Sequence, residues 1–300
     1  MLFRSLADSD FSAAFDAASA VDQLTLVETA APAAVTRREC FGNSVRCALE
    51  LALLDATGRS CGLPVSQLIL DHPAFTDITR PRTEVAYSGV VTSQSPASQV
   101  LSALKLRLFG FSQIKVKVGA AGLSDADSLR RIRRIMGRHC GIRLDANEAW
   151  HTESLRTAVE PLLPFHPLSL EQPVPHAETP GLAELRREFF VPAGLPVMLD
   201  ESLCCAEDAQ RAIAGQWCDA FNLRLSKCGG ILRSLRILKL ADRHGIRCQL
   251  GCQVGETGIL SAAGRHFACS VANLWFAEGS YDRFLVRDRL TEQDLTFRWG

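Results

Sequence analysis

The sequence has no excess of charge of either sign. Its 33 Lys and Arg residues balance 33 Asp and Glu residues over 300 positions. Without a basic stripe or a block of like charge, nothing in it points to a nucleic-acid partner. No apolar run approaches the roughly 18 residues of a membrane span. The N-terminus, MLFRSLADSDFSAAFDAASA, has aspartates where a signal peptide needs an apolar core, so we expect a cytoplasmic protein.

Several common motifs are also missing. The 11 cysteines form no CxxC pair and no Cys/His spacing typical of a zinc site, which favours reduced, mostly buried thiols. No GxGxxG follows the first predicted strand, and GxxxxGK[ST] does not occur. These absences count against the dinucleotide-binding and phosphate-loop folds.

The composition is 47% hydrophobic and 22% charged, which is typical of a soluble globular protein with a large core. Residues 1–80 read as helical. The segment Ser44–Ala56 places apolar side chains at helical spacing, and a Gly62-Leu63-Pro64 turn follows it. From about residue 81 to residue 300, short β-rich runs alternate with amphipathic segments. We therefore expect two parts, a helical region over 1–80 and an α/β domain over 81–300.

Alternating strands and helices predict a parallel sheet. Eight strand candidates within about 200 residues suit a closed (β/α)8 barrel, and an open doubly wound sheet is the alternative. The candidates are Glu84–Val91, Ser112–Val118, Gly141–Asp145, Leu168–Glu171, Pro196–Asp200, Asp219–Leu225, Ile246–Leu250 and Asn273–Glu278.

The second strand candidate contains two lysines. Residues two apart on a strand share a face, so Lys115 and Lys117 point the same way. If Val116 and Val118 pack against helices, both lysines point into the protein, where a lysine must be paired or used. An edge strand with two solvated lysines is the alternative.

Three further strands end in a carboxylate, at Asp145, Glu171 and Asp200. Strand ends of a barrel share one face, where active sites are built. Converging carboxylates repel one another, and a hard divalent cation relieves this, so we expect Mg²⁺, with Mn²⁺ as an alternative. Singly, each acid could equally be a helix cap or an ion-pair partner. Asn147 and Glu201 follow two of these residues and are candidates for supporting or substrate contacts.

Lys227 follows the sixth strand candidate. In an eight-stranded barrel the second and sixth strands stand opposite each other, so Lys117 and Lys227 would face each other across the mouth. A carboxylate held by a metal has a more acidic α-proton, and a desolvated lysine beside other cations can remove it. Enzymes that form an ene-diolate on Mg²⁺ combine the same parts, a Lys or His base and the metal.

Five motifs together resemble the enolase superfamily: Lys115-Val-Lys117, Asp145-Ala-Asn147, Glu171-Gln-Pro173, Asp200-Glu201-Ser202 and Lys227-Cys-Gly-Gly230. More narrowly, they resemble its muconate-lactonizing subgroup, which includes muconate cycloisomerases, dipeptide epimerases, N-succinylamino-acid racemases and o-succinylbenzoate synthases. The resemblance implies Mg²⁺ on Asp145, Glu171 and Asp200. It also implies acid/base roles for Lys117 and Lys227 on opposite faces of a metal-stabilised enolate, with Lys115 assisting.

The family usually has a cap domain with a small β-sheet, and this chain shows only helices before the barrel. We therefore expect a reduced or truncated cap, and an exposed barrel top that could contact a second copy. Gln253 and Glu278 lie in the seventh and eighth strand loops and are candidates for substrate contacts, although the Asp-x-Asp of dipeptide epimerases is missing.

The resemblance implies a small carboxylate substrate and an isomerase, either a cycloisomerase or a racemase/epimerase. An o-succinylbenzoate synthase-like dehydratase and a non-catalytic metal-binding barrel are the alternatives.

Overall fold

The computed structural model of the protein describes residues 40–92, 95–288 and 290–297. The strands are β1 (Gly89–Val91), β2 (Gln113–Lys117), β3 (Gly141–Asp145), β4 (Leu170–Glu171), β5 (Val197–Leu199), β6 (Ala220–Leu223) and β7 (Arg247–Leu250). The longer helices are α2 (Asn43–Cys61), α3 (Val65–Asp71), α4 (Pro96–Leu108), α5 (Asp125–Met136), α6 (Thr152–Val159), α9 (Ala206–Ala214), α11 (Ile231–Arg243) and α12 (Gly258–Ser270). Shorter helices are α7 (Leu182–Leu185), α8 (Val191–Ala193), α10 (Leu225–Cys228) and α13 (Asp282–Leu285), with tighter or wider turns at η1 (Pro73–Phe75), η2 (Glu160–Phe165), η3 (His176–Gly181) and η4 (Arg186–Phe190).

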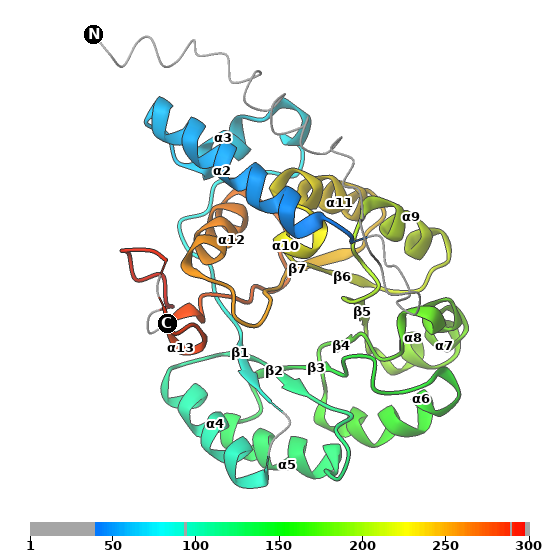
Figure 1. Ribbon diagram of the computed structural model, residues 1–300. Helices are drawn as coiled ribbons and strands as arrows, with labels where there is room; N and C mark the ends of the chain where they lie inside the picture. Colours follow the sequence, from blue (N-terminus) through cyan, green and yellow to red (C-terminus); the bar gives the residue numbers. More distant parts are fainter. Residues whose placement is uncertain (1–39, 93–94, 289, 298–300) are drawn as a thin grey trace, which may run out of the picture.

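The strands form one parallel sheet in chain order, β1 to β7. Figure 1 shows them arranged around a common centre with helices on the outside. Ala277 bridges both Leu250 at the end of β7 and Tyr87 just before β1, so this segment closes the ring. The architecture is the α/β barrel that the alternating pattern predicts.

The eighth strand expected over 273–278 is not a regular strand. It pairs with its neighbours only through the isolated bridges of Ala277. Gly279 follows with φ 141°, a conformation that residues with a side chain rarely adopt. The other expected strands are present, and most are shorter than predicted; β1 and β4, for example, keep only the last residues of the expected runs.

The region before the barrel is helical in its described part, and residues 1–39 of the expected 1–80 unit lie outside the described residues. Helix α2 is tied to the barrel by Glu50, which accepts hydrogen bonds from the backbone N–H groups of Ile231 and Leu232 at the start of α11. Gly230, which precedes Ile231, has no room for a Cβ because the Glu50 carboxylate lies against it. A carboxylate is favoured at a helix N-terminus, so Glu50 anchors α2 on α11.

The outer face of α2 exposes Val45, Leu49 and Leu53, four residues apart along the helix. Such a stripe is the kind of surface that contacts another molecule, and self-association remains a prediction. Among the described helices, none combines the length and the hydropathy of a membrane span. All 11 cysteines are free thiols, as expected, and most are buried.

Candidate active site

The strand register brings the predicted residues of β2, β3 and β4 side by side. Lys117 lies opposite Asp145, and Asp145 lies opposite Glu171. All three end their strands, so their side chains line one end of the ring. Asp200 follows β5 directly and is buried, as Asp145 and Glu171 are.

The two lysines of β2 differ in environment. The Lys117 ammonium donates to Asp145 Oδ2 at 2.7 Å and to Asn147, and its side chain is 27% exposed. Lys115 lies one layer deeper and is 5% exposed. Its Nζ is 2.9 Å from Glu278 Oε2, 3.1 Å from Asp145 Oδ2 and 3.5 Å from Glu171 Oε1. Lys115 therefore links three buried carboxylates, whereas Lys117 reaches toward the mouth.

Burial and neighbouring charges have opposing effects on the pKa values of Lys115 and of the carboxylates. Burial would lower the pKa of Lys115, but the acids around it outweigh burial and raise it well above its usual value. Burial and the neighbouring Asp145 raise the pKa of Glu171 to about 8. Burial would raise the pKa of Asp200, but its cationic neighbours lower it to about 2. Glu171 is thus the acid whose charge is compensated least, consistent with its longer distance from Lys115.

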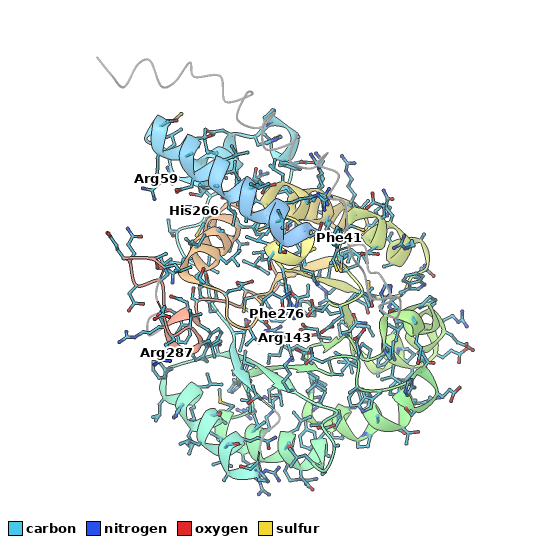
Figure 2. All side chains as sticks on the ribbon, viewed as in Figure 1. Phe41, Arg59, Arg143, His266, Phe276 and Arg287 are labelled. Atoms are coloured by element: carbon cyan, nitrogen blue, oxygen red, sulfur yellow. The ribbon has the colours of Figure 1, made fainter. Side chains whose placement is uncertain are left out.

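A second polar layer fills the barrel below these strand ends. Arg143, on β3 beside Lys115, is fully buried and donates to Glu278 Oε1 at 2.9 Å and to Gln249. Figure 2 shows Arg143 and Phe276 together near the centre of the ring, and the guanidinium carbon lies 4.4 Å from the ring centroid of Phe276. Burial opposes ionisation of Glu278, but Lys115 and Arg143 outweigh it and bring its pKa to about 2. Both Glu278 oxygens are therefore engaged inside the barrel.

The remaining predicted residues join the same network. Asn147 Nδ2 donates to Glu201 Oε1 at 2.9 Å. Burial and Asp200 raise the pKa of Glu201. Gln253, on the loop after β7, accepts from Arg224 Nη1 at 2.9 Å.

Two cations stand at the end of β6. Arg224 follows the strand directly, and its Nη2 pairs with Asp200 Oδ2 and lies 3.8 Å from Glu171 Oε1. Lys227 lies one helical turn later, in α10. Its ammonium donates to Asp200 Oδ1 and to the backbone carbonyls of Asp200 and Asn222.

The donor set fits a hard divalent cation in its chemistry. Asp145, Glu171 and Asp200 are buried, come from adjacent strands and offer only oxygen. The raised pKa of Glu171 reflects its burial beside another carboxylate, and a bound cation would relieve the repulsion between these negative charges. In this structure the three carboxylates turn to lysine and arginine, and no group of three or more His, Cys, Asp or Glu in the described ranges surrounds one point as a metal cage would.

Sequence reasoning missed four polar residues of this network: Arg143, Asn222, Arg224 and Gln249. Asn222 Nδ2 donates to Glu171 Oε1 at 2.7 Å, and Gln249 Nε2 donates to Glu171 Oε2 at 3.2 Å. Alternation along β3 could have found Arg143, because it is two residues before Asp145.

A family model described as "Enolase C-terminal domain-like" matches residues 99–300. The chain belongs to the enolase superfamily. Epimerases, racemases and cycloisomerases of the muconate-lactonizing subgroup are among its relatives, including an N-succinyl-L-Arg/Lys racemase from Bacillus cereus and a chloromuconate cycloisomerase from a Pseudomonas strain.

Two relatives show the extent of the likeness. The D-Ala-D/L-Ala epimerase of Cytophaga hutchinsonii is 34% identical over 218 residues, which are 70% of this chain and 54% of that protein. The hydrophobic dipeptide epimerase of Enterococcus faecalis is 30% identical over 240 residues, 79% of this chain and 64% of that protein. The chain therefore spans less than two thirds of the length of these relatives.

A solved structure agrees with the fold. The Cytophaga hutchinsonii dipeptide epimerase complexed with Mg and the dipeptide D-Ala-L-Val has a TM-score of 0.72 and 28% identity, covering 85% of this chain and 67% of the other. This enolase-superfamily chain thus shares the barrel of a protein that was crystallised with magnesium.

Proposed function

We propose that this protein catalyses Mg²⁺-dependent removal of the proton α to a carboxylate on a small-molecule substrate, as a cycloisomerase or a racemase/epimerase. The observation that carries the proposal is the level row of Lys117, Asp145 and Glu171 at the ends of three adjacent strands, with Asp200 on the next. A base beside a set of buried acids is the arrangement that this chemistry needs.

Asp145, Glu171 and Asp200 would hold the cation. When bound, the cation would neutralise the negative charge that builds on the substrate carboxylate as the α-proton leaves. Their buried positions keep water from competing for this charge.

Lys117 is the proposed base. Its amine takes the α-proton, the C–H bond breaks, and the electron pair moves onto the carboxylate oxygens. Lys115 holds Asp145 and Glu171 in place from below, and Asn147 fixes the Lys117 ammonium from the side. The opposite face of the substrate meets the β6 side, where Lys227 and Arg224 lie.

Proton exchange tests the proposal. The protein is incubated with Mg²⁺ in D₂O with N-acyl amino acids, dipeptides, a muconate or the o-succinylbenzoate precursor, and NMR follows deuterium entry at the α-carbon. We expect exchange with at least one class, abolished by EDTA and by Lys117→Met. The surface change Arg134→Lys on α5 is the matched control and retains exchange. Tight Mg²⁺ binding without exchange from any class would favour a non-catalytic barrel.

A further inference from the structure

The cationic side chains on the two sides of the carboxylate row differ in type: a lysine lies on the β2 side and an arginine on the β6 side. The contacts run from Lys117 through Asp145, Lys115 and Glu171 to Arg224 and Asp200. Lys117 ends β2, and Arg224 directly follows β6. In an eight-stranded barrel the second and sixth strands stand opposite each other. The position that faces Lys117 is thus held by Arg224, and Lys227 belongs to the next helical turn.

Lys227 is committed to the protein. An ammonium has three hydrogens to donate, and Lys227 has three acceptors around its Nζ, two of them backbone carbonyls. Its side chain is 10% exposed. Its own carbonyl accepts from Asn43 Nδ2 at 2.7 Å, so the turn is anchored from α2 as well. These bonds join the end of β5 to the end of β6 and leave Lys227 no donor for a ligand.

Arg224, unlike Lys227, keeps one donor that no group in the described part of the chain uses. Two of its nitrogens are held by Asp200 and Gln253, which fixes the plane of the guanidinium. Its Nε–H is buried and has no hydrogen-bond partner among the described residues. A guanidinium keeps its charge throughout the pH range in which proteins fold, so it can donate a hydrogen bond or hold an anion but cannot accept a proton.

We propose that proton transfer occurs on the β2 face of the substrate only, through Lys117, and that Arg224 presents a fixed cation and hydrogen-bond donor to the other face. This inference rests on the proposed function and narrows it. After Lys117 has taken the α-proton, the same ammonium returns a proton to the same face, or a leaving group departs with the electron pair. The site therefore favours cycloisomerisation or elimination over racemisation or epimerisation.

Enantiomer-resolved exchange tests the substrate side of the inference. The L and D forms of an N-succinyl amino acid are incubated separately with the Mg²⁺-loaded protein in D₂O, with NMR for exchange and chiral chromatography for inversion. We expect one form to exchange at least about 100-fold faster than the other without inversion, the size of a general-base effect. Arg224→Lys, which restores an amine, should bring the ratio below about 10-fold, whereas Arg134→Lys on the outer surface of α5 leaves it unchanged.

Inversion, or similar exchange of both forms by the wild-type protein, would overturn the one-face inference while leaving the proposed function intact. Absence of exchange from this substrate and from every other class named under the proposed function would instead count against the proposed function. A second measurement is independent of turnover: the metal-free protein is briefly acetylated, and mass spectrometry compares Lys117 with Lys227. We expect Lys117 to react at least about 10-fold faster, because all three donors of Lys227 are engaged. Equal reaction would overturn the assignment of Lys227 as an anchor, whatever the substrate.

Discussion

Lys115 and Lys117 provide a matched pair of substitutions, since they lie two residues apart on one face of β2. Methionine keeps the length of the lysine stem and removes the charge, so packing is largely retained. Lys115→Met leaves three buried carboxylates without their shared cation. Removing one partner from a buried ion pair typically costs about 3–5 kcal/mol.

The Lys117→Met change should cost much less. The Lys117 side chain is 27% exposed, and its partner Asp145 keeps Lys115 at 3.1 Å. We expect a loss of about 1 kcal/mol or less, in the range of partly exposed pairs. Its effect falls on the reaction instead, where loss of a general base slows exchange by roughly 100- to 10,000-fold.

The assay is urea unfolding in EDTA, so that no divalent cation replaces the lost ammonium, followed by proton exchange with Mg²⁺. For a chain of this size a loss of about 4 kcal/mol corresponds to a melting temperature lowered by roughly 6 °C. Equal destabilisation by the two substitutions would refute the division into a structural and a reactive lysine. So would full exchange activity in Lys117→Met.

Four other outcomes follow from the contacts and pKa values described above. Mg²⁺ should raise the melting temperature of the metal-free protein, because it stabilises the folded state by about 2.7 kcal/mol at 100 times its Kd. Asp200→Asn should remove most of that temperature shift and weaken Mg²⁺ binding in a calorimetric titration. In EDTA, stability should fall between pH 5 and 8, because Glu171, with a pKa of about 8, keeps a proton that the unfolded chain releases near 4.5; urea midpoints that rise over this range would contradict this. Glu278, with a pKa of about 2, acts in the opposite sense, and the stability that it supplies above pH 4.5 should be lost as the pH falls toward 2. Glu50→Ala should destabilise the protein by about 1–2 kcal/mol, measured by the same unfolding curves, because α11 loses its cap, and an unchanged midpoint would exclude that role.

The sequence by itself determined the local features of this protein. The two-residue period of a strand places Lys115 with Lys117 and Arg143 with Asp145, and it needs no knowledge of the partner strands. The spacing of strand ends indicated a barrel with its acids on one face, and the family match agrees with that prediction. These features depend on residues that are near one another in the chain.

Only the tertiary structure decided which groups meet. Arg143 and Glu278 are 135 residues apart, and they pair because the ring closes at Ala277. The eighth strand is reduced to the isolated bridges of Ala277. The tertiary contacts pair Arg224 with Asp200 and engage Lys227 with the backbone carbonyls of Asp200 and Asn222, a difference between two nearby cations that spacing could not resolve. The physical reason is that the direction and hydrogen bonds of a side chain just past a strand end depend on neighbouring loops.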